Sequence, residues 1–331
     1  MQAIQHAPVT LLVHGGAGTL TRADLSPAQE LEYREALGQA LRAGQALLLQ
    51  GGTALDAAVA AVCVLEDCPL FNAGKGSVFT HEGRNEMDAA VMDGATGQAG
   101  AVAGVVSVRN PILAAQAVMQ RSGHVFLMGQ GAEAFARTQG LALEGPEYFH
   151  TAHRWQQLQT ALAQNQITLD HDGSPASATS LINPMNPTDP TDRKFGTVGA
   201  VALDAHGHLA AATSTGGMTN KMFGRVGDSP LIGAGTYACD ATAAVSATGA
   251  GEFFMRGVVA HDIAARMAYG GLSLAEATQA TVREKLDATG GRGGVIALDR
   301  QGHYQLAFNT EGMYRGVVQG QAEPQISIYR D

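Results

Sequence analysis

The apolar positions in the first part of the chain predict a strand followed by two helices. A short apolar run, VTLLV, predicts a strand over residues 9–14, and the loop HGGAGT follows it. Helical periodicity then covers 26–50, with Ser26 placed to cap its start, and 53–66. Gly51 and Gly52 separate the two. The chain therefore begins with one strand and a consecutive pair of helices.

The next hundred residues mix strand patterns with helix patterns. Apolar runs near 87–93 and 100–108, joined by the turn DGATGQ, predict two strands. Shorter helical patterns cover 111–121, 130–139 and 151–164. These strands and helices continue the mixed character of the first segment.

A proline-rich stretch divides the chain near its middle. Residues 165–195 hold four of the 11 prolines and show no periodicity, so we expect a mobile surface linker. The strand predicted after this stretch lacks a partner strand unless it pairs with the earlier strands. We therefore expect residues 1–331 to form one domain, with 165–195 as an exposed tether inside it.

The second half of the chain repeats one hairpin formula, as ALDAHGHLAAA and as ALDRQGHYQLA. The second copy belongs to a final hairpin over 293–309, and helical patterns cover 251–270 and 273–287 between the two copies. Hairpins and long helices without regular βαβ alternation favour an α+β fold, in which helices cover antiparallel sheets.

The first of these hairpins predicts a specific pair of opposed residues. Its turn is the three-residue loop 205–207, which ends in the glycine that a left-handed bulge position requires. Asp204 then faces His208, and stepping outward along both strands brings Thr197 opposite Thr215. Directly opposed side chains of an antiparallel pair lie about 5 Å apart at Cβ. The hairpin therefore predicts two hydroxyl groups in contact.

Composition and charge narrow the class of ligand. The chain is 45% apolar and only 15% charged, and its 42 glycines suggest a closely packed globule. A net charge of −9 leaves no basic surface for nucleic acid or an anionic membrane, so a small molecule is the expected partner. Cys63, Cys68 and Cys239 form no CxxC pair, which is typical of reduced thiols in the cytoplasm. The N-terminal apolar run is too short for a signal sequence or a membrane span.

Thr197 stands at the first position of a strand, directly after Gly196 and the linker. If the Gly196–Thr197 bond were cut, one residue would carry both a hydroxyl group and an α-amine. Such an amine has a pKa of about 7.7 to 8.0 and can act as the base for its own hydroxyl nucleophile. An ordinary strand-forming threonine is the alternative at this position.

The motifs that surround this threonine resemble those of the plant-type (type 2) L-asparaginase and isoaspartyl peptidase family, whose members are N-terminal nucleophile hydrolases. The resemblance spans nearly the whole chain in family order, and together the motifs are specific although each glycine-rich piece alone is weak. They are HGGAGT at 14–19, CPLFNAGKGSVFT at 68–80, DAAVMDG at 88–94, GTVGAVALD at 196–204, TSTGGMTNK at 213–221, GRVGDSPLIGAGTYA at 224–238, TGAGE at 248–252 and FNTEGMYR at 308–315.

The resemblance implies a four-layer αββα sandwich and a precursor that cuts itself before Thr197. The products would be an α subunit, 1–196, which carries the linker, and a β subunit, 197–331, paired as an (αβ)2 heterotetramer. The mature enzyme would release L-aspartate from β-aspartyl dipeptides and from L-asparagine, without an organic cofactor. Glycosylasparaginase, the more distant taspase-like proteases and a non-catalytic amino-acid-binding module are the alternatives.

By resemblance, Thr197 is the nucleophile and Thr215 binds its amine or hydroxyl group, whereas a plain cross-strand contact is the alternative for Thr215. Asn72 would orient the nucleophile, or would merely be a turn residue. Arg225 and Asp228 would bind the carboxylate and the ammonium of the substrate. Without the resemblance, these two residues would be interpreted as a solvated ion pair.

Thr248 and Gly249 precede a predicted helix. A hydroxyl group and a backbone N–H placed there can stabilise the oxyanion of a tetrahedral intermediate, and an ordinary helix cap is the alternative. The sequence GAGEFF lacks the third glycine of a dinucleotide-binding loop and follows no βαβ unit.

The loop after the second predicted helix resembles a family segment that wraps a sodium ion with main-chain carbonyl groups. Hard cations prefer oxygen ligands, and carbonyl ligation leaves no signature in the side chains. The implied ligands are the carbonyl oxygens of Leu65, Glu66, Cys68, Phe71, Ala73 and Lys75.

Overall fold

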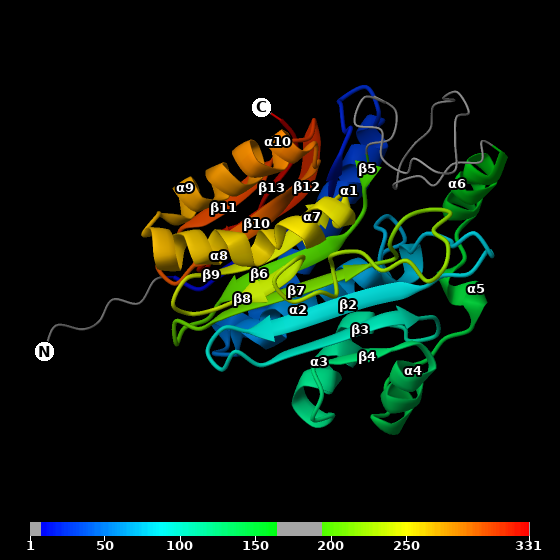
Figure 1. Ribbon diagram of the computed structural model, residues 1–331, viewed down its shortest axis with the longest axis horizontal. Helices are drawn as coiled ribbons and strands as arrows, with labels where there is room; N and C mark the ends of the chain where they lie inside the picture. Colours follow the sequence, from blue (N-terminus) through cyan, green and yellow to red (C-terminus); the bar gives the residue numbers. More distant parts are fainter. Residues whose placement is uncertain (1–7, 164–193, 331) are drawn as a thin grey trace, which may run out of the picture.

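The computed structural model describes residues 8–163 and 194–330, which form two β-sheets and the helices that cover them (Figure 1). The larger sheet has the strand order β13-β12-β1-β6-β7-β2-β3-β4, with β5 pairing beside β1. Neighbouring strands are antiparallel except β3 and β4. Its members are β1 (Thr10–Gly18), β2 (Met87–Asp93), β3 (Ala99–Val105), β4 (Phe126–Met128), β5 (Lys194–Phe195), β6 (Val198–Leu203), β7 (Leu209–Thr215), β12 (Gly312–Gln319) and β13 (Gln325–Tyr329).

The smaller sheet comes entirely from the second half of the chain. Its order is β11-β10-β9-β8, and every neighbouring pair is antiparallel. The strands are β8 (Thr236–Ala238), β9 (Ala243–Gly249), β10 (Gly293–Asp299) and β11 (Tyr304–Phe308).

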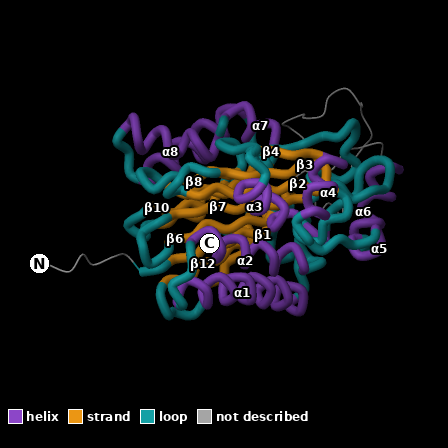
Figure 2. Tube along the Cα trace, turned by 90° about the horizontal axis from the view of Figure 1, so that it is seen from below, coloured by secondary structure: helices purple, strands orange, loops and turns teal. Residues whose placement is uncertain are grey.

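Helices from the two halves of the chain lie on opposite sides of the strands (Figure 2). Helices α1 (Pro27–Leu49), α2 (Ala54–Asp67) and α3 (Pro111–Arg121) contact the larger sheet, whereas α8 (Val259–Gly270) and α9 (Leu274–Thr278) contact the smaller one. The remaining elements are α4 (Gly129–Thr138), α5 (Pro146–Phe149), α6 (Ala152–Ala163), α7 (Gly251–Gly257), α10 (Leu286–Thr289), a 3₁₀ turn (Gly74–Gly76) and a π-helical segment (Gln279–Lys285).

Three apolar clusters fill the spaces between these layers. One lies between α1, α2, α3 and the larger sheet, and includes Leu37 and Val62. A second lies between the two sheets, where Leu12 and Ile296 belong to one cluster. The third joins the smaller sheet to α8 and α9. Side chains alternate between the two faces of each strand, so both sheets bury both faces.

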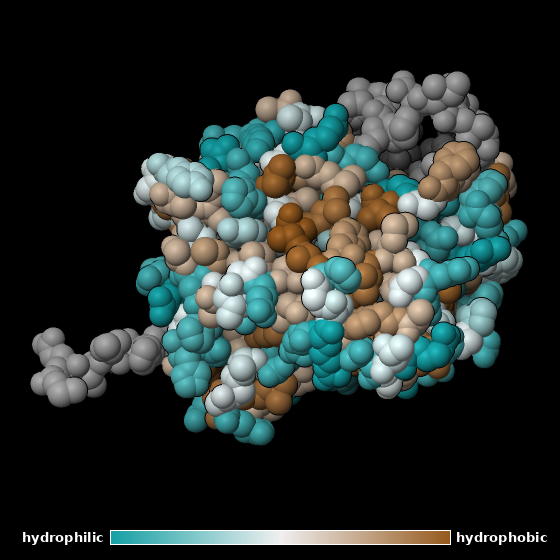
Figure 3. Space-filling model, turned by 60° about the horizontal axis from the view of Figure 1, so that its bottom comes forward, coloured by the Kyte–Doolittle hydropathy of each residue, from teal (hydrophilic) through white to brown (hydrophobic). Residues whose placement is uncertain are grey.

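The surface in Figure 3 gathers apolar side chains near the centre of one face, within a polar surround. None of the helices in 8–163 and 194–330 combines the length and apolarity that crossing a membrane requires. All three cysteines are free.

The α+β prediction of helices on antiparallel sheets is confirmed, and so are the first two helices. Ser26 caps α1, where its Oγ accepts from the N–H of Gln29 at 3.3 Å, and Thr53 caps α2 in the same way at 3.1 Å from Asp56 N. Hydroxyl caps of this kind satisfy N–H groups that the first helical turn leaves free.

Several predicted boundaries were wrong. The strand predicted over 9–14 continues to Gly18, and the hairpin over 293–309 is not the last, because β12 and β13 follow it. The helix predicted over 251–270 is interrupted at Val258, which has a φ of +47°. Just after this break the N–H groups of Ala260 and His261 bond to the carbonyl oxygens of Ala234 and Gly233, and the apolar pattern carries no signal for such a contact between distant segments.

Val258 supplies a stability prediction. A β-branched residue is strained in the left-handed region, whereas asparagine tolerates it. We expect Val258→Asn to raise the free energy of unfolding by about 1 kcal/mol. The measurement is urea unfolding beside Val106→Asn, a control at a position of similar exposure (43% against 45%) that is not among the residues with positive φ. Equal effects of the two substitutions would contradict the strain argument.

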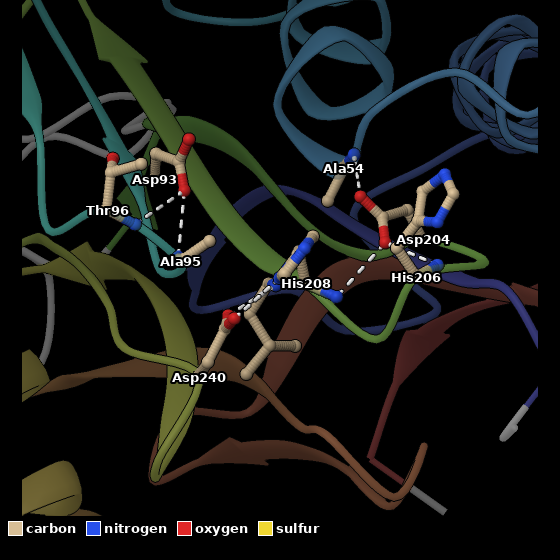
Figure 4. A network of polar contacts seen from close by, with 9 residues as sticks. Ala54, Asp93, Ala95, Thr96, Asp204, His206, His208 and Asp240 are labelled. Atoms are coloured by element: carbon tan, nitrogen blue, oxygen red, sulfur yellow. Dashed lines mark hydrogen bonds and ion pairs between the residues drawn. The ribbon is translucent and has the colours of Figure 1, made fainter. Parts of the chain in front are cut away.

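The β6–β7 hairpin is held at its turn by Asp204 (Figure 4). Its Oδ1 accepts from the N–H groups of His206 and His208 at 2.9 and 3.0 Å, and its Oδ2 accepts from Ala54 N at the start of α2. Gly207 has a φ of +80°, the left-handed value that the predicted turn requires. The register of β6 against β7 is therefore fixed from the turn outward.

Candidate active site

Thr197 and Thr215 meet at the open end of this hairpin, as predicted. The register pairs Val198 with Ser214, so that Thr197 lies opposite Thr215. The Thr197 hydroxyl donates to Thr215 Oγ1 at 3.1 Å, and the same Thr215 oxygen accepts from Gly217 N at 3.0 Å. Both threonines are buried. The structure thus brings two hydroxyl groups together directly after Gly196.

The segment before Thr197 differs from its prediction at one end. Most of the predicted linker 165–195 lies outside the described residues, but Lys194–Phe195 forms β5 and pairs with Gly18 and Ala17 of β1. Gly196 is buried between β5 and β6. The bond expected to be cut is therefore held by pairing on both sides.

A small cavity of about 20 Å³ adjoins these residues. The space suffices for about one water molecule. It brings together Gly196, Thr197 and Thr215 with segments that are far away in the sequence. The other lining residues are Gly217, Met218, Arg225, Gly227, Asp228, Ser229 and Gly249.

Arg225 and Asp228 lie in this cavity wall but do not form the solvated ion pair that was the alternative interpretation. Arg225 instead pairs with Glu252 of α7, with its Nε and Nη2 at 2.9 and 3.0 Å from the two carboxylate oxygens. Sequence reasoning missed Glu252, because its partner is 27 positions away and follows another strand. The bidentate geometry holds the guanidinium at the cavity.

Asp228 is buried, and its Oδ2 has no hydrogen-bond partner in 8–163 and 194–330. Burial raises the pKa of this carboxyl group to about 7, against the opposing effect of the Arg225 charge. A buried carboxylate oxygen without a partner is costly, so its presence at a cavity indicates a site for a cationic ligand group.

Thr248 also carries a polar atom that is left unpaired within the described part of the chain. It is fully buried, and its Oγ1 meets no partner there. Alternation along β9 places Thr248 on the same face as Ser246, which bonds to the larger sheet. Gly249 follows it in the cavity wall, and Ala250 is the N-cap residue of α7. Thr248 is therefore not the helix cap, and the alternative interpretation was wrong.

Asn72 joins the loop after α2 to the residues that follow Thr215. Its Nδ2 donates to the Gly217 carbonyl at 2.7 Å, and its own carbonyl accepts from Gly216 N at 3.0 Å. Its Oδ1 accepts from Val78 N. Asn72 thus holds the main chain of Gly216 and Gly217, directly after Thr215, and none of these bonds reaches Thr197 itself.

The loop that contains Asn72 turns tightly enough to gather main-chain oxygens. A Cβ added to Gly74 would lie 2.4 Å from the carbonyl oxygen of Glu66, and one added to Gly76 would lie 2.1 Å from that of Phe71. The Lys75 ammonium lies over the Tyr148 ring at 5.3 Å, so this side chain points away from the loop carbonyls. Hard cations prefer oxygen donors of this kind, although the carbonyl oxygens of Leu65, Cys68, Phe71 and Ala73 each also accept a main-chain N–H. The described residues hold no cluster of three His, Cys, Asp or Glu side chains suited to a metal.

Sequence reasoning gave no role to His14, which contacts the candidate nucleophile. Its Nδ1 lies 3.0 Å from the Thr197 carbonyl oxygen, and its Nε2 lies 2.9 Å from Ser246 Oγ. The motif HGGAGT was the available signal, because it puts one polar aromatic residue in an otherwise apolar strand.

Comparison with known proteins gives a consistent result. The family described as asparaginase (Asparaginase_2) matches residues 7–328. Isoaspartyl peptidases of Salmonella typhimurium and Escherichia coli are each 53% identical over 321 residues, which cover 97% of this chain and 98% and 96% of theirs. A plant-type L-asparaginase of Pyrococcus furiosus is 40% identical over 322 residues, covering 97% of this chain and all of the relative.

Proposed function

The chain belongs to the asparaginase family, and from this premise we propose that it is a hydrolase that releases L-aspartate from β-aspartyl dipeptides and from L-asparagine. The observation that carries the proposal is the contact between the Thr197 and Thr215 hydroxyl groups beside Arg225 and Asp228. The first pair supplies a nucleophile with its hydrogen-bond partner, and the second pair supplies opposite charges for an amino acid.

The proposed reaction needs the chain to be cut between Gly196 and Thr197. The freed Thr197 amine accepts the proton of its own hydroxyl while Oγ1 bonds to the side-chain carbonyl carbon of the substrate. Thr248 Oγ1 and the N–H of Gly249 stabilise the resulting oxyanion, and Thr215 orients the nucleophile. The amine or ammonia leaves with the proton, and water then hydrolyses the Thr197 ester to free aspartate.

Self-cleavage also accounts for the small cavity of the intact chain. The space is about 20 Å³, below the roughly 300 to 1,000 Å³ of typical ligand pockets, and Gly196 forms part of its wall. Release of Gly196 and β5 would enlarge it on the side of the nucleophile. We therefore propose an α subunit of 1–196 and a β subunit of 197–331 within one domain.

Helices α1, α2 and α3 cover the larger sheet, this sheet packs on the smaller one, and α8 and α9 cover the smaller sheet. These four layers support the αββα sandwich of N-terminal nucleophile hydrolases as the proposed architecture. The apolar area in Figure 3 is of the kind that oligomers cover, in keeping with an (αβ)2 assembly. Sedimentation of the cleaved protein tests that assembly. The cytoplasmic location remains a prediction that rests on the cysteine pattern.

A sodium ion is proposed for the loop after α2. The carbonyl oxygens of Leu65, Glu66, Cys68, Phe71, Ala73 and Lys75 would hold it, and its role would be to fix the loop that carries Asn72. Arg154 supports this loop from outside that set, since its guanidinium bonds to the carbonyl oxygens of Gly76 and Leu70. The proposed sodium ligands and the contacts of Arg154 therefore belong to the same loop.

Asp228 should give the reaction a characteristic pH dependence. Protonated Asp228 is neutral and binds the substrate ammonium weakly, so KM should fall as the pH rises from about 6 to 8 through the pKa of about 7. Asp228→Asn should raise KM roughly 10- to 100-fold at pH 8 and should remove this dependence. Steady-state kinetics on asparagine measure both, and an unchanged KM in the variant would rule out the assigned role.

Substrate choice separates the proposal from its nearest alternatives. Aspartate release should be measured from β-Asp-Leu, from asparagine and from a glycosylated asparagine. We expect the first two to be cleaved. Cleavage of the glycosylated substrate alone would indicate a glycosylasparaginase, and aspartate binding by a chain that never splits would indicate a binding module.

A further inference from the structure

We infer that His14 is a positioning residue for the proposed hydrolysis: Ser246 and Thr213 hold its ring as the Nδ1–H form, which fixes the Thr197 carbonyl and thereby the nucleophile. The inference rests on the proposed function, because it assigns His14 a part in that reaction. It concerns a residue that touches the main chain of Thr197 and not the reacting atoms.

The contacts form a continuous buried chain between the two sheets. The Thr197 carbonyl oxygen lies 3.0 Å from His14 Nδ1, and His14 Nε2 lies 2.9 Å from Ser246 Oγ. Ser246 Oγ lies 2.7 Å from Thr213 Oγ1, which is also 3.3 Å from the Gly235 carbonyl oxygen. His14, Ser246 and Thr213 are all fully buried. One line of hydrogen bonds thus connects Thr197, which precedes β6, with β1, β9 and β7.

The direction of these bonds follows from the chemistry of the groups. A carbonyl oxygen only accepts, so His14 Nδ1 carries the proton. Burial lowers the pKa of His14 to about 3, against the opposing effect of its bond to Thr197, so the ring is neutral near pH 7 and Nε2 is an acceptor. Ser246 must then donate to Nε2, and its oxygen is left to accept from Thr213. Each partner selects the same imidazole form.

The His14 ring reaches Thr197 where the pairing of β1 with β6 has ended. Pairing between β1 and β6 ends with His14 opposite Gly199, two residues before Thr197 is reached. Beyond that point the His14 side chain, and not the β1–β6 ladder, connects β1 to the Thr197 carbonyl. A Cβ added to Gly199 would lie 2.0 Å from Ser246 Oγ and 2.5 Å from His14 Nε2, so only glycine leaves room for this arrangement.

Such an anchor matters most after cleavage. A free N-terminal Thr197 has lost its bond to Gly196, and β6 itself begins only at Val198. Its carbonyl and its hydroxyl then each keep one fixed partner, His14 and Thr215. Holding both restricts the rotations that would carry the nucleophile out of line.

The test compares cleaved wild type with Ser246→Ala, His14→Asn and His14→Gln. Asparagine can place an N–H near the position of Nδ1, whereas glutamine places one nearer to Nε2. We expect kcat to fall about tenfold in Ser246→Ala and more in His14→Gln, with partial rescue in His14→Asn and with KM within about twofold. Thr278→Val, which removes a buried hydroxyl group from α9, should leave kcat unchanged.

Nitrogen NMR of the histidine rings gives a second readout that needs no activity. Wild type should show the His14 ring in the Nδ1–H form from pH 5 to 8. In Ser246→Ala the ring should keep this form, because the Thr197 carbonyl still requires it, but its Nε2 resonance should shift because Nε2 loses its hydrogen bond. A His14 ring in the Nε2–H form would overturn the inference. Unchanged kcat in both Ser246→Ala and His14→Gln, measured beside active wild type, would also overturn it. A wild-type chain that is neither cleaved nor active would overturn the proposed function itself, and with it this role of His14.

Discussion

A Thr197→Ala chain should remain uncut and should release no aspartate. The substitution removes the hydroxyl group proposed to attack both the Gly196–Thr197 bond and the substrate, so we expect hydrolysis to fall by at least about 10⁴-fold. The fold should survive, because the side chain contributes one hydrogen bond, to Thr215 at 3.1 Å. Intact-mass spectrometry and an aspartate assay measure the two effects on the same sample.

Two further substitutions show whether the hydroxyl group is responsible. Thr197→Val keeps the branched shape and should behave like alanine, whereas Thr197→Ser keeps the hydroxyl group and should retain some cleavage and some activity. Normal cleavage of the alanine or valine chain would mean that another residue cuts the precursor.

Thr248→Val should change activity and stability in opposite directions. Valine has nearly the shape of threonine but removes Oγ1, which meets no partner in the described residues although it is fully buried. Loss of an oxyanion donor should lower kcat by about 100- to 1,000-fold. Loss of an unpaired buried hydroxyl group should raise the free energy of unfolding by on the order of 1 kcal/mol.

The two effects need separate samples. Activity is measured on the cleaved fraction, and urea unfolding is measured in the uncut Thr197→Ala background, where the protein is a single chain. Thr248→Ser serves as the control, since it keeps the hydroxyl group and should lose much less activity. A valine variant with kcat within twofold of wild type would remove Thr248 from the oxyanion site.

The parts of this site that could be predicted from sequence are those set by local rules. The turn at 205–207 determines the hairpin register, and the register alone places Thr197 opposite Thr215. The cap of α1 likewise follows from Ser26 and from the residue pattern after it. These features depend on residues within about 20 positions of each other.

The remaining features depend on contacts between distant segments. Arg225 pairs with Glu252 instead of the nearer Asp228, and His14 reaches Ser246, which is 232 positions away. A pattern of apolar positions contains no information about which strands of two sheets come to face each other. The break at Val258 shows the same limit, because the N–H groups of Ala260 and His261 just after it bond to the carbonyl oxygens of Ala234 and Gly233 in a distant loop.

N-terminal sequencing of the smaller fragment of the active protein tests the central claim most directly. The account predicts a fragment that begins T-V-G-A-V, which would place the new amine on Thr197. Active protein whose only N-terminus is that of the full chain, or whose fragment starts at another residue, would contradict it.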